Sequence, residues 1–151
     1  MINKFLLIFG VFTLFSCGKP EIFSQVKEFS EAKMLWNDPT EYQFTIEEEE
    51  PLNAFFHIQH NNDYAFRNIY FFTRVEWPNG ETKEDTLQYM LAKPSGEWLG
   101  GGIGASKKMY LHYPLNINQK GNYKVNVWQA MRKDTLVGIE KLAFSIQKHE
   151  N

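Results

Sequence analysis

Residues 121–128 read GNYKVNVW, and this short stretch decides the fold. Tyr123, Val125 and Val127 alternate with Lys124, Asn126 and Trp128. Successive side chains of a β-strand point to opposite faces of a sheet, so a period of two indicates a half-buried strand. A tyrosine behind a glycine turn is also typical of a β-sandwich corner, where its hydroxyl bonds back to the backbone; an ordinary core tyrosine is the alternative.

The same period of two recurs along most of the chain. It predicts strands near residues 42–46, 52–60, 64–77, 85–92, 107–113, 123–128 and 142–146. Turn residues separate these segments, no long amphipathic helix interrupts them, and the 16% share of aromatic residues suits pleated, half-buried surfaces. We therefore predict an all-β fold, a β-sandwich of about seven or eight mainly antiparallel strands. Residues 64–77 are expected to form a long central strand that pairs with 85–92 in a hairpin.

The N-terminus has the layout of a bacterial lipoprotein signal peptide. A short basic start precedes an apolar run from Phe5 to Phe15, and Ser16 leads to the chain's single cysteine, Cys17. Such a signal is cut directly before a cysteine that becomes acylated. A transmembrane helix is the alternative, but it needs about 20 apolar residues, and polarity begins at Ser16. We expect a signal peptide over 1–16 and a lipid anchor at Cys17 that holds the protein on a membrane.

The rest of the chain has the size of one domain. Cleavage before Cys17 leaves 135 of the 151 residues. Residues 17–37 are expected to form a lipidated tether and an irregular or loosely helical arm, and residues 38–151 a single β-sandwich domain. The arm is expected to pack through one of three side chains: Phe29, Met34 or Trp36.

Candidate catalytic and metal-binding groups are few. His57, His60 and Asp63 are close in sequence, but strand positions three apart point to opposite faces, so we expect two exposed histidines beside a turn. The acidic run at 47–50 lacks the spaced oxygens and glycine of a calcium loop. The glycines near Gly100 lead into a strand, whereas a dinucleotide site needs a helix N-terminus. We expect no catalytic residue, metal, cofactor or small-molecule substrate, and the net charge of −2 argues against nucleic acid.

One loop holds the candidate partner-binding residues. Residues 93–105 carry five glycines around Trp98 and Leu99. Such a loop has much conformational entropy to lose, so fixing two large apolar side chains in it is costly unless they are buried. They are expected to be buried either in the sandwich itself or against a partner protein. A different alternative is a glycan-binding sandwich that uses exposed tryptophans such as Trp98 or Trp128.

Several short segments are distinctive in their order and spacing. They are Asn62-Asp63-Tyr64, Asn68, Pro78-Asn79-Gly80, residues 85–92 (DTLQYMLA), 96–100 (GEWLG), 129–132 (QAMR) and 136–139 (LVGI). With Cys17, these segments resemble the gliding motility lipoprotein GldH family of Bacteroidetes-type bacteria over nearly the whole chain.

The resemblance implies a non-enzymatic accessory or scaffold lipoprotein of the cell envelope. It would work with other gliding motility proteins and be linked to type IX secretion. Only Cys17 carries over as a functional position, as the site of lipid attachment. The implied location is the outer membrane in preference to the inner one, with the domain in the periplasm or at the cell surface.

Overall fold

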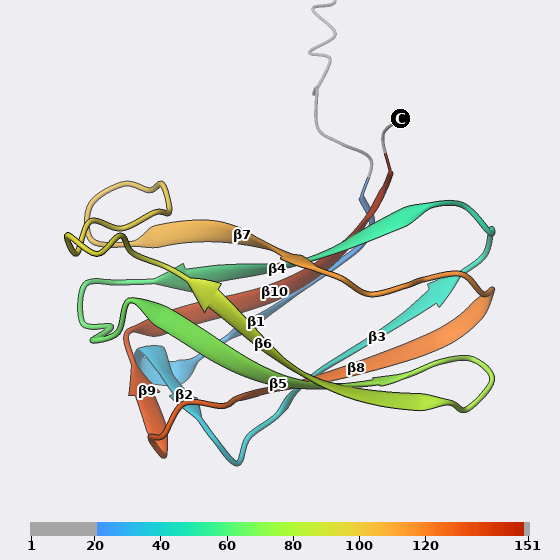
Figure 1. Cartoon of the computed structure of the whole chain (residues 1–151), viewed down its shortest axis with the longest axis horizontal. Coiled ribbons are helices and arrows are strands. Elements are labelled where there is room, and N and C mark those ends of the chain that lie inside the picture. Colours follow the sequence, from blue (N-terminus) through green and yellow to red (C-terminus); the bar gives the residue numbers. More distant parts are fainter. Residues whose placement is uncertain (1–20, 150–151) are drawn as a thin grey trace, which may run out of the picture.

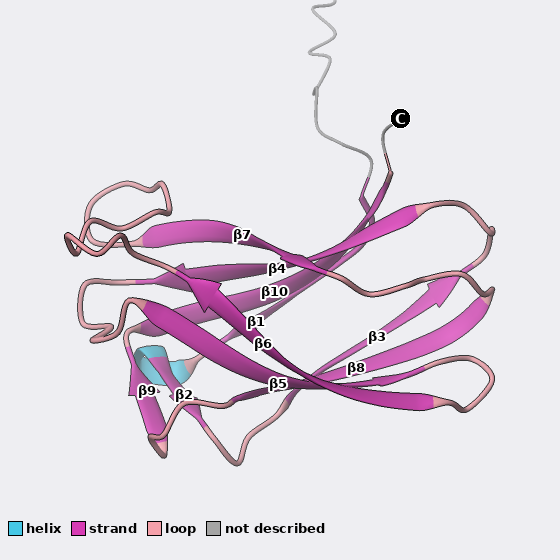
Figure 2. Ribbon diagram, viewed as in Figure 1, coloured by secondary structure: helices cyan, strands magenta, loops and turns pink. Residues whose placement is uncertain are grey.

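A computed structural model describes residues 21–149 as ten strands and one turn of 3-10 helix (Figure 1, Figure 2). The elements are β1 (Glu21–Glu28), η1 (Ser30–Ala32), β2 (Lys33–Leu35), β3 (Thr40–Ile46), β4 (Leu52–His60), β5 (Asn68–Glu76), β6 (Thr82–Met90), β7 (Lys107–Tyr113), β8 (Gly121–Gln129), β9 (Thr135–Val137) and β10 (Ile139–Lys148). The expected signal peptide and Cys17 lie outside the described residues.

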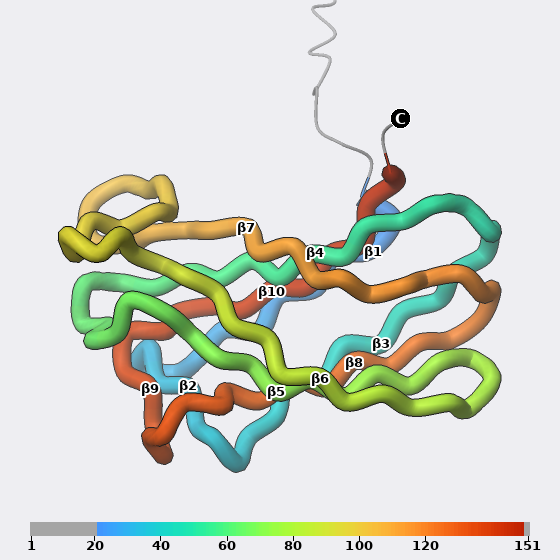
Figure 3. Tube along the Cα trace, in the orientation of Figure 1, coloured from blue at the N-terminus to red at the C-terminus, as the bar shows by residue number. Residues whose placement is uncertain are grey.

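Two four-stranded sheets form the two layers of a sandwich (Figure 3). One sheet has the strand order β1-β10-β4-β7 and the other the order β3-β8-β5-β6, while β2 and β9 form a small separate pair. Every registered strand pair is antiparallel. The prediction of an all-β, antiparallel β-sandwich is confirmed.

The core lies between the two sheets and is rich in aromatic rings. The alternation of β4 buries Ala54, Phe56 and Ile58 completely, as the sequence predicted. The ring of Phe56 lies 5.2 Å from that of Phe144 on β10, measured between centroids. It also lies 5.8 Å from the ring of Phe71 on β5, in the opposite sheet. Aromatic pairs of this kind add about 0.5–1.5 kcal/mol each beyond the burial of their area.

The prediction of an irregular or loosely helical arm is wrong for residues 21–28. Residues 21–28 form β1, which pairs with β10 from Glu21 opposite Gln147 to Glu28 opposite Lys141. The sandwich therefore extends N-terminally of residue 38.

The side chains expected to hold the arm divide into two groups. Phe29 and Met34 are buried as anticipated, whereas the side chain of Trp36 is 55% exposed. Met34 lies on β2, whose three residues pair with β9, so the second half of the arm is also stranded.

The predicted hairpin is confirmed with shifted ends. β5 pairs with β6 from Asn68 opposite Met90 to Glu76 opposite Thr82. Tyr64 was expected to begin the central strand but lies in the preceding loop. Its ring is buried there, and its hydroxyl donates to the Asn68 carbonyl over 2.8 Å.

Tyr123 makes the corner contact that its position suggested. Its hydroxyl donates to the carbonyl of Gln119 over 2.8 Å and accepts from the backbone N–H of Gln119 over 3.1 Å. Both bonds reach back four residues to the chain that enters β8. The corner interpretation therefore holds over that of a tyrosine which only fills the core.

Candidate functional site

Three loops gather at one end of the sandwich, on the left in Figure 1. They join β4 to β5, β6 to β7 and β8 to β9. The register explains their proximity, because the C-terminal end of β4 and the start of β7 are paired as His60 opposite Lys107. This end holds the glycine-rich loop and both candidate partner-binding residues.

Trp98 is bound to the sandwich. Its indole N–H donates to the side-chain oxygen of Asn62 over 3.1 Å. Its ring lies 4.4 Å from the imidazole of His60, between centroids, and its backbone forms a bridge with Ala92. These contacts leave the Trp98 side chain partly buried and packed against the core of the sandwich.

Leu99 lies beside Trp98 but faces outward. Its backbone N–H donates to the carbonyl of Leu91 over 2.8 Å, so the main chain is held, yet the side chain is 45% exposed. Further along the loop, Ile103 is 97% exposed, the largest exposed fraction of any large apolar residue described. Sequence reasoning missed Ile103, although its place among four glycines was a visible signal.

Two glycines hold the loop in a compact shape. A Cβ on Gly102 would lie 2.1 Å from the carbonyl oxygen of Ser106, and one on Gly100 would lie 2.8 Å from that of Lys108. Between them, the Gly101 carbonyl accepts from the Lys108 N–H over 2.7 Å. These two glycines therefore allow close packing of backbone on backbone, and the loop presents Ile103 from a defined fold.

Glu140 ties the end of this loop to the sheet. The hydroxyl of Ser106 lies 2.8 and 3.0 Å from the two carboxylate oxygens of Glu140, and the Gln59 amide donates to the same carboxylate over 2.8 Å. Burial by itself raises the pKa of Glu140, but the hydrogen bonds from Gln59, Ser106 and Asn61 and the nearby His60 together outweigh burial, so the pKa is lowered. The carboxylate therefore stays charged and keeps the base of the loop on β4 and β10.

We expected His57 and His60 to be exposed, but both are buried. His60 is completely buried and His57 is 7% exposed. His57 lies 2.7 Å from the hydroxyl of Ser145, and the ring of Tyr110 covers it at 4.4 Å. For both imidazoles burial lowers the pKa, helped at His57 by the charge of Lys108, since an apolar site disfavours the imidazolium.

For His60, the physical reason for the error is the alternation itself. His60 continues the buried series of Ala54, Phe56 and Ile58, so its parity places it inward. The Asn-Asn-Asp turn that follows suggested that His60 would be exposed to solvent, but Trp98 from a distant segment covers the His60 ring.

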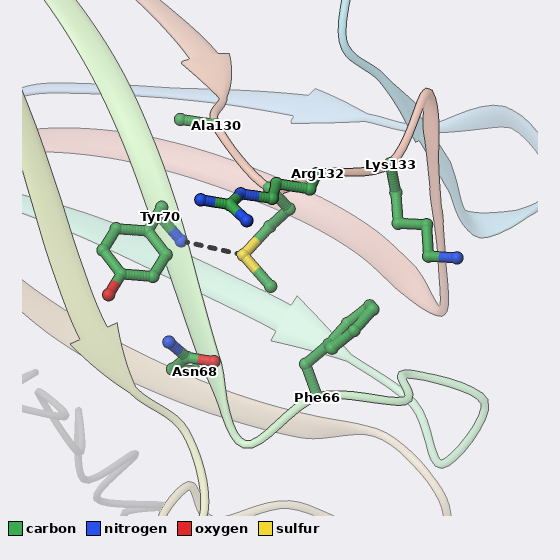
Figure 4. A pocket seen from close by; sticks show the side chains of 7 residues that line it. Phe66, Asn68, Tyr70, Ala130, Arg132 and Lys133 are labelled. Atoms are coloured by element: carbon green, nitrogen blue, oxygen red, sulfur yellow. Dashed lines mark hydrogen bonds between the residues drawn. The ribbon is translucent and has the colours of Figure 1, made fainter.

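A cavity of about 590 Å³ lies at the same end of the sandwich, between the start of β5 and the β8–β9 loop (Figure 4). Met131 lines the cavity, and its sulfur accepts from the Tyr70 N–H over 3.4 Å. Figure 4 shows Arg132 reaching over β5 toward Tyr70, whereas Lys133 points away. Arg132 and Lys133, which line the cavity, add positive charge to this end of the protein.

The tryptophans of the glycan-binding alternative are both packed. Trp98 lies against His60 of β4, and Trp128 lies on β8 in the other sheet with its ring 5.7 Å from that of Phe72. The structure does not bring the two rings together as one binding face.

Residues 21–149 contain no helix long and apolar enough to cross a membrane. Within the same range no three His, Cys, Asp or Glu side chains are grouped so that they could hold a metal ion.

Comparison with known proteins gives close sequence relatives. A family model described as GldH lipoprotein matches residues 21–146. A gliding motility lipoprotein GldH homolog from Christiangramia forsetii is 33% identical, with 99% of this chain and 97% of the relative covered. The gliding motility lipoprotein GldH of Flavobacterium johnsoniae is 31% identical, with 98% of each chain covered.

A solved structure shows a weaker likeness. Dimeric latent PorU from Porphyromonas gingivalis aligns with 83% of this chain at 12% identity and a TM-score of 0.33. The alignment spans 12% of the PorU chain.

Proposed function

This chain belongs to the GldH lipoprotein family, and from that premise we propose that it is a non-enzymatic accessory or scaffold subunit of the gliding motility machinery, linked to type IX secretion. As a gliding-motility lipoprotein it is anchored to a membrane of the cell envelope. The proposal assigns the anchor to Cys17 and places the domain at the outer membrane.

The exposure of Ile103 is the observation that supports docking. A loop whose glycines are used for close backbone packing holds this aliphatic side chain 97% exposed, with Leu99 at 45% nearby. Single exposed apolar residues are common on protein surfaces, whereas a contiguous apolar patch marks a contact site, and Leu99 and Ile103 are proposed to form the apolar part of such a patch. The loop surface, defined as Leu99 and Ile103, is therefore proposed to contact another envelope protein.

The charges around the loop surface indicate the chemistry of that partner. Lys107 donates to the Gly104 carbonyl over 2.9 Å, and Lys108 lies over the ring of Tyr110 at 5.3 Å. Neither ammonium is in an ion pair within residues 21–149. A partner with an apolar groove and an acidic rim would complement both the aliphatic and the cationic groups.

The test replaces the loop surface without touching Trp98. The double variant Leu99→Ser, Ile103→Ser, expressed with its signal peptide in the producing bacterium, is expected to reach the membrane at normal levels and to abolish colony spreading. Affinity capture from intact envelopes is expected to lose the partners recovered with the natural chain. Val26→Ser is the matched control, since Val26 is an exposed apolar residue, at 53%, on β1. Normal spreading of the double variant would refute the docking proposal.

A further inference from the structure

The first strand begins very close to the proposed anchor. Residues 18–20 alone separate Cys17 from Glu21, and Glu21 is already paired with Gln147 of β10. A fully extended chain spans at most about 3.6 Å per residue, so the Cα atoms of Cys17 and Glu21 are within about 14 Å of each other. A flexible tether of many residues would let the domain tumble, but this link is shorter than the domain itself.

The register identifies which end of the sandwich the link reaches. In the first sheet, Glu21 lies beside Gln147, and Gln147 lies beside Asn53 at the start of β4. The turn at 47–51 connects β4 to the end of β3, so the same end of the second sheet is adjacent. We call this the link end; the β3–β4, β5–β6 and β7–β8 connections lie there, on the right in Figure 1.

The opposite end carries most of the exposed apolar surface. Six of the nine exposed large apolar side chains described lie there: Leu35, Trp36, Met90, Leu99, Ile103 and Val137. At the link end the group contains Ile22 alone, at 38% exposure. The nine residues of β4 correspond to about 30 Å of strand, and this sets the separation of the two ends.

We propose that the link end is a membrane-facing surface, which stands on the lipid headgroups around the anchor and holds the loop surface pointing away from the membrane. This inference rests on the anchor at Cys17 in the proposed function. It identifies the partner of the link end as the lipid surface and leaves the far end, about 30 Å away, for protein contacts.

The chemistry of the link end fits contact with headgroups and does not fit insertion into hydrocarbon. The β3–β4 turn carries four consecutive glutamates, Glu47 to Glu50, of which Glu50 pairs with Lys148 over 2.8 Å. A carboxylate is strongly disfavoured in an apolar medium. The surface therefore rests above the headgroups, and repulsion holds it farther from an anionic surface than from a zwitterionic one.

The experiment measures the distance of each end from the lipid. Because Cys17 is the chain's only cysteine, Glu49→Cys and Ser95→Cys each add one labelling site to the acylated protein, one per end. The purified, acylated chains are placed in phosphatidylcholine vesicles that contain headgroup nitroxide lipids, and a thiol-linked fluorophore reports quenching. We expect several-fold stronger quenching at position 49 than at position 95.

The control lengthens the link. A flexible Gly/Ser insertion of about 15 residues between Gly18 and Lys19 gives the domain room to turn over, so the difference between the two labels is expected to shrink. Equal quenching with the natural link, or stronger quenching at position 95, would overturn the inference. If mass spectrometry showed no acyl group on the chain, the inference would also be overturned, because it rests on the anchor at Cys17. Normal colony spreading of the Leu99→Ser, Ile103→Ser variant would refute the docking proposal and leave the orientation standing.

Discussion

The indole of Trp98 lies 4.4 Å from the imidazole of His60, between centroids, at an interplanar angle of 60°. His60 is completely buried, its Nδ1 lies 3.2 Å from the Asn61 carbonyl, and its Nε2 has no hydrogen-bond partner within residues 21–149. A neutral ring with its proton on Nδ1 donates to this carbonyl and leaves Nε2 as an unpaired acceptor. The contact joins the glycine-rich loop to the interior of the sandwich.

Trp98→Ala is expected to destabilise the domain, while Leu99→Ala is not. Loss of a fully buried tryptophan costs about 3–5 kcal/mol, and for this half-buried ring about 2 kcal/mol is expected. Leu99 is 45% exposed, so its truncation should change the free energy of unfolding by less than about 0.5 kcal/mol. Urea unfolding of a chain that starts at residue 18 measures both. Equal losses in the two variants would contradict the distinction between them.

The free energy of unfolding is expected to fall as the pH drops below the pKa of an ordinary histidine. Burial lowers the folded-state pKa of His60 and of His57 below the usual 6.5. Between the folded and unfolded pKa values the unfolded chain binds more protons, so the stabilisation is present above about pH 6.5 and is lost as the pH falls toward the folded pKa.

Unfolding midpoints at pH 7.5 and pH 5 test this dependence. His60→Leu removes one titrating group and should reduce the difference between the two midpoints. Ile58→Leu, a conservative change at a buried position of β4 that does not titrate, serves as the control and should leave the difference unchanged. A His60→Leu chain with the full pH dependence of the natural protein would show that His60 is not the group responsible.

Neighbouring glycines in the loop are expected to respond differently to alanine. Gly102→Ala places a Cβ 2.1 Å from the Ser106 carbonyl oxygen, so the backbone must move and Ile103 must shift with it. Gly101→Ala meets nothing within 4 Å and should be neutral. Colony spreading and partner capture are expected to fail for Gly102→Ala alone, with both chains present in the membrane. Loss of spreading in both would mean that loop shape is not the cause.

Cys17→Ala is expected to release the domain from the membrane. The apolar run from Phe5 to Phe15 is too short to span a bilayer, so acylation is the anchor that we propose. Incorporation of a fatty-acid probe should disappear, and the domain should move to the soluble fraction. Ser16→Ala keeps a small residue before the cysteine and is the control for processing. A Cys17→Ala chain that stays in membranes after signal cleavage would contradict anchoring at Cys17.

Strands with one buried face could be predicted from the sequence because their pattern is local. In β3, Tyr42, Phe44 and Ile46 are buried and their neighbours exposed, which is the alternation visible in the residues themselves. β1 could not be found in this way. Seven of its eight residues are exposed, so an edge strand held by pairing with β10, more than 100 residues away, leaves no period of two.

The candidate site was predictable in part for the same reason. Glycine spacing marked the 93–105 loop, but the roles of Trp98 and Ile103 depend on contacts across the fold. Trp98 is packed because Asn62 and His60 from the preceding loop and strand reach it. Gly102 packs closely on the Ser106 backbone, and Ile103, the next residue, is 97% exposed.

Tyr123→Phe is expected to destabilise the domain although it removes a single oxygen. The ring stacks on Phe44 at 5.1 Å and 3°, and phenylalanine preserves that contact. The hydroxyl, however, holds both the carbonyl and the N–H of Gln119 in a partly buried corner. Leaving these groups without partners should cost about 1–3 kcal/mol of unfolding free energy. Tyr110→Phe is the matched control, because Tyr110 is 59% exposed and its hydroxyl can remain solvated. Urea unfolding should show a lower free energy of unfolding for Tyr123→Phe and no change for Tyr110→Phe. If Tyr123→Phe were as stable as the natural chain, the corner hydrogen bonds would be a consequence of the fold and would not stabilise it.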